Sequence, residues 1–397
     1  MIRIKPYNEL SQKEEIFNLY LYLVSNAMPF YPEDIFPEGY YYRDGKVKTD
    51  ISKYIRQPRN RTKNYIKILE KYNISVGKTI TEKKKSDVLL AEKIIQSYSE
   101  ELHKFLYEDM SDGHIIPDNL RTLLLASVSF DSLVIFSFFK EAHNADTDVK
   151  KEEKMELLKY VFRYKEFRNQ KDIYRFVSLL GVEVCPYCNR LFTTTVTKGK
   201  QIGPQLDHYR SKSKYPFLAL SILNLVPCCG VCNHIKGNDP TEILYPYEEE
   251  MGERCSFSVD TERDLTVLTG ARINHDELTI TLKQLDKKSP IGKHIKASID
   301  LLNLKEVYQS HKGYVSDLLF QRYVFTDEMV KEIMNSFPDL FKNEKEVREM
   351  LLLNKFDREH WGDRPLGKLT HDISEELDFL YNNKNYPELF TDIRNCV

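Results

Sequence analysis

The chain has 397 residues, of which 41% are hydrophobic and 30% are charged, and its formal net charge at pH 7 is −2. This composition indicates a globular protein with material for two or three domains, and it excludes an intrinsically disordered chain. A net charge so close to zero also excludes binding of nucleic acid through overall basicity, so any such binding must come from local patches.

The chain carries no sign of export or of a disulfide framework. Residues 1–15 hold no apolar run of the kind a signal peptide needs. Most of the seven cysteines lie in closely spaced pairs, which fit a metal and a reducing compartment better than disulfides. Residues 122–139 are apolar, but Asp131 interrupts them, so we interpret the segment as a buried core helix and not a membrane span. We therefore expect a cytoplasmic protein with no membrane contact.

Residues 1–170 predict a helical N-terminal region. Apolar residues recur at helical spacing in segments at 12–23, 88–108, 120–140 and 151–164, and in a further segment at 171–180. The last segment ends near Gly181, which suits a helix C-cap. Prolines exclude a regular helix in the aromatic stretch at 28–42.

Basic residues crowd the stretch 46–87. Ile66 and Leu69 lie among them at helical spacing, which predicts an amphipathic helix. Two interpretations stay open, a solvated helix face and a surface that follows the phosphates of a nucleic acid. The basic residues are Lys53, Arg56, Arg59, Arg61, Lys63, Lys67, Lys71, Lys83, Lys84 and Lys85.

Two Cys-x-x-Cys knuckles predict a structural zinc site. They are Cys185/Cys188 and Cys229/Cys232, and each spacing places two sulfurs about one turn apart. Together they supply the four thiolates of a tetrahedral zinc, which would hold a polar segment that has little core of its own. Cys228 offers a second choice of ligand, but Cys229 keeps the two-residue spacing to Cys232.

The segment between the knuckles carries residues suited to hydrolysis. Residues 191–197 and 201–208 flank a Lys-Gly-Lys turn and predict a β-hairpin, whose second strand ends in Asp207-His208. A histidine of near-neutral pKa can activate a water molecule, and a neighbouring carboxylate suits an ion such as Mg²⁺. Taken alone, an Asp-His pair of this kind is more often structural.

With the knuckles around it, this set of residues resembles the HNH endonuclease family, in the branch whose catalytic ββα unit is framed by a structural zinc. The resemblance covers residues 184–239 alone. It implies that His208 is the general base, that Asp207 binds a catalytic Mg²⁺ or Mn²⁺ ion, and that Asn224 orients the histidine or braces the loop. The family's second knuckle begins five residues after this middle asparagine, which favours Cys229 over Cys228.

The resemblance also implies further site residues. The position after the last cysteine, Asn233, corresponds to the family's second ligand of the catalytic ion, with His234 as the alternative ligand. Contacts to substrate phosphates would come from Lys236, Arg210, Lys212 and Lys214, for each of which a solvated surface position is the competing interpretation. The Cys-Pro-Tyr-Cys-Asn-Arg run at 185–190 and the Lys-Ser-Lys-Tyr-Pro run at 212–216 are similar to a prokaryotic branch found in anti-phage and mobile-element systems.

Beyond the motif the pattern changes twice. Residues 254–284 alternate between apolar and polar side chains and predict two or three short antiparallel strands. Helical periodicity then returns at 291–302, 305–323, 327–336, 344–354 and 372–381. We expect an α+β protein that is mainly helical, with an N-terminal region at 1–170, a ββα-metal module at 171–245 and a C-terminal region at 246–397.

The sequence thus predicts a metal-dependent HNH endonuclease that hydrolyses DNA, with structural Zn²⁺ and catalytic Mg²⁺ or Mn²⁺. RNA is an open alternative substrate. The branch implies a bacterial anti-phage defence effector acting beside a partner ATPase, and cutting both strands with one site per chain commonly needs a homodimer. The competing class is a non-catalytic, zinc-stapled module that binds nucleic acid or a partner.

Overall fold

The computed structural model describes residues 1–27, 42–43, 46–47, 124–125, 128, 158–159, 162–259 and 278–382. The predicted basic helix near Ile66, the predicted helix at 88–108, and most of those at 120–140 and 151–164 lie outside these residues. The described part is mostly helical and contains three two-stranded antiparallel sheets, which makes it a mixed α+β fold. None of its helices has both the length and the apolar character needed to span a membrane.

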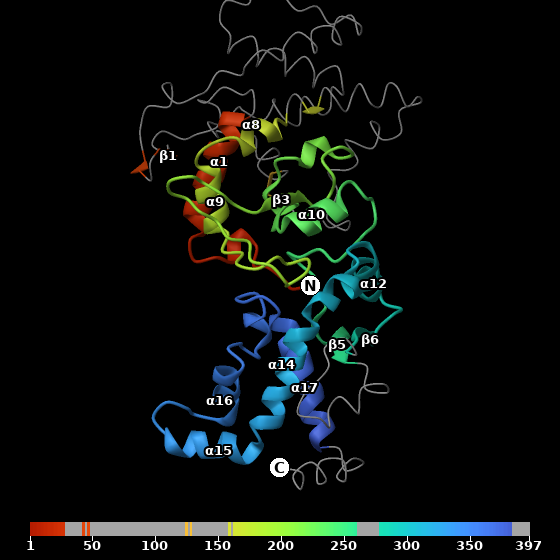
Figure 1. The fold of residues 1–397 in the computed structure, drawn as a ribbon. Helices are drawn as coiled ribbons and strands as arrows, with labels where there is room; N and C mark the ends of the chain where they lie inside the picture. Colours follow the sequence, from red (N-terminus) through yellow and green to blue (C-terminus); the bar gives the residue numbers. More distant parts are fainter. Residues whose placement is uncertain are drawn as a thin grey trace, which may run out of the picture.

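Three helices form the first layer. Their bounds are α1 Lys13–Ala27, α8 Tyr164–Arg168 and α9 Ile173–Leu179. Helix α1 confirms the prediction for 12–23, because the apolar residues at helical spacing, Ile16, Leu19, Tyr20 and Leu23, are all fully buried. It packs against α8 and α9 (Figure 1). Helix α9 also follows its prediction and ends before Gly181, whose φ is +63°.

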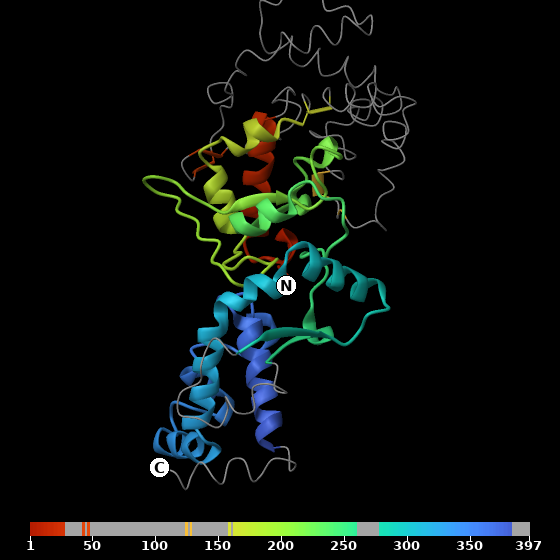
Figure 2. The same cartoon turned by 45° about the vertical axis from the view of Figure 1, so that its right-hand side comes forward.

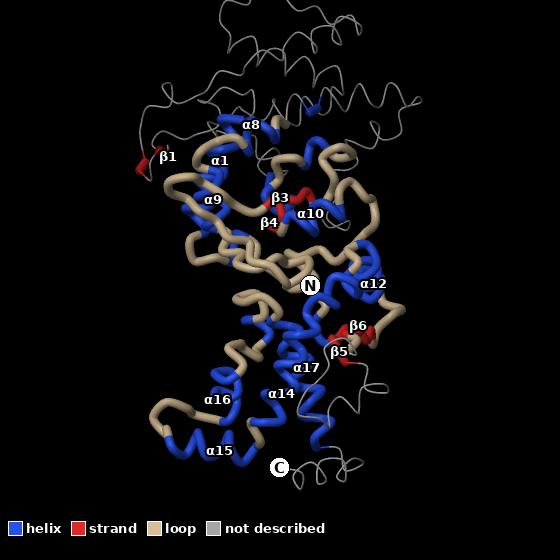
Figure 3. Tube along the Cα trace, in the orientation of Figure 1, coloured by secondary structure: helices blue, strands red, loops and turns tan. Residues whose placement is uncertain are grey.

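Two strands and a helix follow this layer. Strand β3 (Gln205–His208) pairs antiparallel with β4 (Leu225–Cys228), and α10 (Gly230–Lys236) begins two residues after β4 ends (Figure 3). The predicted hairpin of 191–197 with 201–208 is wrong, since only an isolated bridge, Val196 to Ile202, forms there. Phe192 and Ile202 are 60% and 58% exposed, so this stretch buries too little apolar surface to hold a ladder, whereas β4 is buried throughout.

The C-terminal half is a second group of elements. Strands β5 (Cys255–Val259) and β6 (Ile280–Gln284) pair antiparallel, as the alternation predicts. The helices are α12 Pro290–Leu301, α13 Leu304–Tyr308, α14 Lys312–Val324, α15 Asp327–Ser336, α16 Glu344–Leu351 and α17 Gly367–Asn382. The short elements elsewhere are η1 Tyr7–Glu9, β1 Tyr42–Arg43, β2 Lys46–Val47, η5 Pro216–Leu218, η6 Ile222–Asn224, η7 Gly252–Arg254, η9 Gln309–His311 and η10 Arg358–His360.

The single helix predicted for 305–323 is wrong, because the turn η9 divides it into α13 and α14. Tertiary contacts hold the chain at this point. The side chain of Gln309 exchanges two hydrogen bonds with the backbone of Ile280 on β6, and the hydroxyl of buried Tyr308 donates to the carbonyl of Cys188. The break therefore lies where the helix meets both the β5–β6 sheet and the first Cys-x-x-Cys knuckle.

The two groups lie one above the other, with the N-terminal residues between them (Figures 1 and 2). The amide of Ile2 donates to the carbonyl of Pro186 at 3.0 Å, and that of Ile4 donates to Pro246 at 2.8 Å. One buried apolar cluster runs from Met1 to Leu377 through both groups. The division into domains at 1–170, 171–245 and 246–397 stays a prediction, and its first boundary falls between two helices that both pack on α1.

Candidate functional site

Four buried thiols converge in the middle of the molecule. The sulfur atoms of Cys185, Cys188, Cys229 and Cys232 all lie within 4.8 Å of one another, and the Cys188 and Cys229 sulfurs are 3.9 Å apart. Sulfurs around a tetrahedral zinc lie about 3.8 Å apart, given a Zn–S bond of about 2.3 Å. Cys228 is buried but lies outside this cluster. The donor set fits a structural zinc ion, and it is the one such group of metal-ligating side chains among the described residues.

Backbone hydrogen bonds hold the two knuckles in the conformations that bring the four sulfur atoms together. In the first knuckle the amide of Cys185 donates to the carbonyl of Leu191, and the amide of Asn189 donates back to Cys185 at 2.7 Å. In the second, Cys229 caps α10, with its sulfur accepting from the amide of Cys232. Hydrogen bonds from the neighbouring thiols lower the pKa of Cys229, while burial raises the pKa of Cys185. A bound cation would favour the thiolate form of all four.

A buried polar network surrounds Asp207, which is 3% exposed. The hydroxyl of Tyr187, inside the first knuckle, donates to Oδ2 at 2.7 Å. The ammonium of Lys236, in the last turn of α10, lies 3.0 Å from Oδ2 and 3.3 Å from Oδ1. It also donates to the carbonyl of His208 at 2.9 Å. The knuckle, β3 and α10 therefore meet at one carboxylate.

His208 ends β3 with its ring buried, at 6% exposure. Its Nε2 lies 3.0 Å from the carbonyl of Ala219. A carbonyl only accepts, so Nε2 carries the proton and donates, and Nδ1 is the basic nitrogen. Burial, reinforced by the ammonium of Lys212, lowers the pKa of His208 to about 3, so the ring is neutral at pH 7 and the near-neutral pKa expected for a water-activating histidine is not found. The ring of Tyr164 on α8 packs edge-on against the His208 ring, with 4.3 Å between the ring centroids. The Lys212 ammonium nitrogen lies 4.6 Å from the centroid of the same tyrosine ring.

Asn224 braces the loop that joins β3 to β4. It is fully buried, and its amide nitrogen donates to the carbonyls of Arg210 and Leu218 at 3.1 and 2.9 Å. Its oxygen accepts from the amide of Arg210 at 2.7 Å. These three bonds fix both ends of the loop that presents Ala219 to His208.

The other predicted site residues lie around this centre. Asn233 is half-buried on α10 and the next residue, His234, is exposed. Lys212 and Lys214 are exposed as well. Arg210 is 9% exposed, and its guanidinium binds Glu242 at 3.1 Å and the carbonyl of Val128 at 3.2 Å. Lys214 thus faces solvent, and Lys212 is exposed although its ammonium lies over the ring of Tyr164. The charged groups of Arg210 and Lys236 are held inside the protein.

A hard divalent cation does not fit Asp207 in this arrangement. Such an ion takes oxygen ligands at about 2.0–2.6 Å, and a carboxylate is its strongest one. Both oxygens of Asp207 already face a cationic ammonium, and one of them also accepts from Tyr187. The carboxylate is available to a metal ion only when Lys236 is elsewhere.

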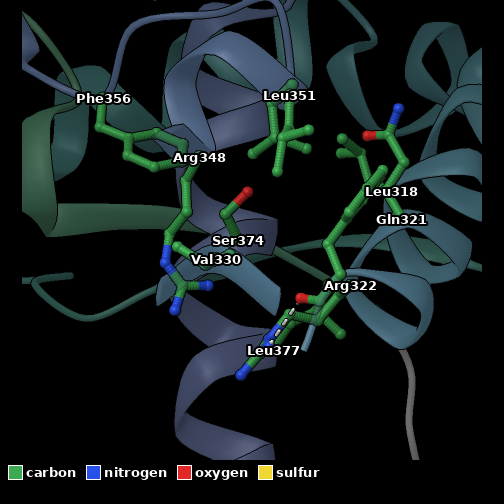
Figure 4. A pocket seen from close by; sticks show the side chains of 11 residues that line it. Leu318, Gln321, Arg322, Val330, Arg348, Leu351, Phe356, Ser374 and Leu377 are labelled. Atoms are coloured by element: carbon green, nitrogen blue, oxygen red, sulfur yellow. Dashed lines mark hydrogen bonds between the residues drawn. The ribbon is translucent and has the colours of Figure 1, made fainter. Parts of the chain in front are cut away.

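A pocket lies in the C-terminal group, between α14, α15, α16 and α17 (Figure 4). It encloses about 420 Å³, open solvent included. Its walls are mainly apolar, with Leu318, Val330 and Phe356 among them. Arg322 and Arg348 also line it, and both bind Asp327, at 3.1 and 2.7 Å. None of its lining residues belongs to β3, β4 or α10.

Sequence reasoning missed Tyr187, Asn189 and Tyr164. Tyr187 and Asn189 stand inside the motif at 185–190, yet no spacing rule says that the hydroxyl of Tyr187 reaches Asp207 or that the amide of Asn189 binds the carbonyl of Trp361. The only sign in the sequence that Tyr187 and Asn189 have a role is their position next to Cys188 in the first knuckle. No motif or spacing in the sequence signals a role for Tyr164, which lies on α8.

No protein-family model, no curated protein and no solved structure matches this chain.

Proposed function

We propose that β3, β4 and α10 form the ββα-metal core of an HNH endonuclease that hydrolyses DNA phosphodiester bonds. The observation that carries the proposal is the orientation of His208. It ends the first strand of a strand–strand–helix unit, and its Nε2 donates to Ala219, which leaves Nδ1 as a base. The order of residues along the unit supports it, with Asp207 before the histidine and Asn233 after the last cysteine.

The proposed division of labour follows from these positions. His208 Nδ1 takes a proton from the attacking water, a role that typically contributes about 10²–10⁴-fold in rate. Asn224 keeps the loop, and with it Ala219, in place. The exposed lysines Lys212 and Lys214 lie just beyond His208 in sequence and contact substrate phosphates. Zinc on the four cysteines fixes the second knuckle and the start of α10.

The proposal includes the Mg²⁺ or Mn²⁺ ion that the resemblance implies. When bound, such an ion neutralises charge on the scissile phosphate. Asp207 and Asn233 would hold it, with His234 as the alternative to Asn233. Since Asp207 is now paired with Lys236, the ion can bind only after that pair opens.

One observation favours the alternative function, a non-catalytic zinc-stapled module that binds nucleic acid or a partner. Both Asp207 and His208 are buried, and the ring of Tyr164 covers the histidine. A module that only binds has no need to expose either side chain. Anti-phage defence and a partner ATPase remain part of the proposal on the strength of the resemblance alone. A homodimer remains part of it because cutting both strands with one site per chain commonly needs two copies.

Nicking of supercoiled plasmid with Mg²⁺, Mn²⁺ or EDTA separates the two functions, and a labelled RNA in parallel decides between the substrates. His208→Ala should lose about 10²–10⁴-fold in cleavage rate, while His360→Ala, an exposed histidine paired with Asp363, should cut like the unmodified protein. If His208→Ala cuts DNA at full rate in the presence of Mg²⁺, the nuclease proposal is wrong.

A further inference from the structure

Residues 191–204 form an arm that runs outwards from the first knuckle and returns to β3. Val196 and Ile202 form a bridge between its two halves, with backbone hydrogen bonds of 2.7 and 3.2 Å. The turn at the tip is Lys198-Gly199-Lys200, and Gly199 has a φ of +65°, which glycine adopts without steric cost. In Figures 1 and 2 the yellow-green chain between the first knuckle and β3 reaches outwards past α9.

The end of the arm that joins β3 is held on the first layer of helices. Gly203 lies so close to the ring of Tyr174 on α9 that an added Cβ would come within 3.1 Å of a ring carbon. The guanidinium of Arg168 on α8 donates to the carbonyl of Pro204 at 3.1 Å, and it also lies 5.1 Å from the centroid of the Tyr174 ring. These contacts anchor the arm, while its tip stays exposed.

The surface of the arm combines apolar and cationic side chains. Val196 and Ile202 are 40% and 58% exposed, and directly paired residues of two strands place their side chains on one face. Lys198 and Lys200 are exposed at the tip. No Asp or Glu occurs from residue 184 to residue 206, although 60 of the 397 residues in the chain are acidic. The charged side chains of the arm are therefore all cationic, which is complementary to a polyanion.

A DNA duplex matches both the shape and the charge of the arm. The major groove of B-DNA is about 12 Å wide and admits a two-stranded ribbon. Apolar side chains contact thymine methyl groups there, and lysines bind the phosphates along the groove. The chain from Ile202 to His208 spans at most about 20 Å when extended, which is less than one turn of the duplex, about 34 Å. The arm and His208 can therefore contact the same turn of one duplex.

We propose that the arm is a DNA-binding element that enters the major groove beside the proposed active site. Val196 and Ile202 lie against the bases, and Lys198 and Lys200 bind phosphates. The inference rests on the proposed function for its partner, DNA, and it adds a contact surface outside β3, β4 and α10. It applies to a module that cuts DNA and to one that only binds it.

The first test measures binding of a fluorescein-labelled DNA duplex by fluorescence anisotropy at several salt concentrations, without added Mg²⁺ or Mn²⁺. Lys198→Gln combined with Lys200→Gln removes both charges from the tip. Each phosphate contact contributes about 0.9 to the slope of log K against log salt, so the slope should become shallower by about two and the affinity should fall at least about tenfold. An unchanged slope, or no binding of DNA by the unmodified protein, overturns the proposal.

Lys287→Gln combined with Lys288→Gln is the matched control for this test. Both lysines are exposed in the C-terminal group, so this variant loses the same charge at a distance from the arm. It should change neither the slope nor the affinity. A loss equal to that of the arm variant would mean that net charge alone sets the binding, and it would overturn the proposal.

The second test addresses the apolar pair. Val196→Thr combined with Ile202→Thr keeps branched side chains and reduces their apolar surface, so DNA binding should weaken several-fold with an unchanged salt slope. Leu285→Thr combined with Leu340→Thr is the control, because both leucines are exposed in the C-terminal group. Side chains cannot read the deep, narrow major groove of duplex RNA, so the Val196/Ile202 variant should bind duplex RNA like the unmodified protein. Unaffected DNA binding, or an equal loss on duplex RNA, overturns the placement in the major groove.

Plasmid nicking by the same proteins is scored separately. All of these variants change exposed side chains, so their melting temperatures should match that of the unmodified protein. Binding through the arm without nicking would refute the nuclease and leave the arm in place. Nicking together with an unchanged salt slope in the Lys198/Lys200 variant would refute the arm alone.

Discussion

At the first zinc knuckle, one residue joins the thiol cluster to the carboxylate of the proposed active site. Tyr187 stands between the ligands Cys185 and Cys188, and its hydroxyl donates to Asp207 on β3. The rigid knuckle thereby sets the position of a side chain 20 residues away in sequence. Substituting one of these cysteines should therefore lower the stability of the fold and also disturb the position of Asp207 in the proposed active site.

Cys229→Ser should abolish stoichiometric zinc binding, because the cluster then offers three thiolates and a poorer ligand. Structural zinc accounts for about 10 kcal/mol or more of apparent folding free energy in small domains, so the melting temperature should fall sharply. Cys228→Ala is the matched control, since the neighbouring thiol is buried outside the cluster. Metal analysis and thermal unfolding of both variants check this. Normal zinc in Cys229→Ser with none in Cys228→Ala would mean that the other sulfur is the ligand.

The buried ring of His208 predicts acid sensitivity. Its pKa is about 3 in the folded protein against 6.5 for a free side chain, so between these values the unfolded state takes up a proton that the folded state does not. The unfolding free energy is therefore unaffected by this group above about pH 6.5, and it falls as the pH drops below that value. Between about pH 7.5 and about pH 5, the unfolding free energy of the unmodified protein should drop by about 2 kcal/mol relative to His208→Gln. Urea unfolding measures it, and a constant gap between the two proteins would contradict it.

At the scale of elements, the first knuckle also contacts the start of α17. Asn189, with a φ of +52°, is fully buried between the knuckle and α17. Its side chain donates to the carbonyl of Trp361 at 2.8 Å and accepts from the amide of Lys368 at 3.0 Å. Its own carbonyl accepts from Leu366 at 2.6 Å. One residue thus satisfies the backbone at the start of α17 and occupies the left-handed conformation that asparagine tolerates well.

Two substitutions of Asn189 should separate these contributions. Asn189→Ala loses both side-chain bonds and strains the backbone, and it should cost about 2–4 kcal/mol of unfolding free energy. Asn189→Gly loses the same bonds but keeps the backbone free, so its cost should be smaller. Urea unfolding gives both values. An alanine variant as stable as the glycine variant would show that the positive φ carries no cost here.

At the scale of the whole molecule, the four-cysteine cluster connects the two groups of elements. The knuckle contacts the N-terminal segment through Pro186, the helix α13 through Cys188 and the start of α17 through Asn189. One apolar cluster runs through both groups. A change that loosens the knuckle should therefore also destabilise the packing of the C-terminal half.

The single tryptophan of the chain reports on this coupling. Trp361 is 2% exposed, and the Lys368 ammonium lies 4.6 Å from its ring. Removing zinc with a thiol-selective reagent and a chelator should release Asn189, shift the tryptophan emission to longer wavelength and increase its quenching by acrylamide. Re-addition of reductant and Zn²⁺ should reverse both changes. Unchanged emission after complete loss of zinc would show that the C-terminal group holds Trp361 without the knuckle.

The sequence by itself determined the features that depend on neighbours along the chain. Cys-x-x-Cys spacing selects the four cysteines that cluster, since each pair is set by one local turn, and helical periodicity locates α1, α9 and α15, whose apolar faces recur every three to four residues. Tertiary structure decided the rest. Strand β3 took β4 as its partner and not the exposed stretch nearer in sequence, because only β4 offers a buried surface. Lys236 met Asp207 because α10 folds back on β3, and a long side chain takes whichever carboxylate the packing brings within its reach.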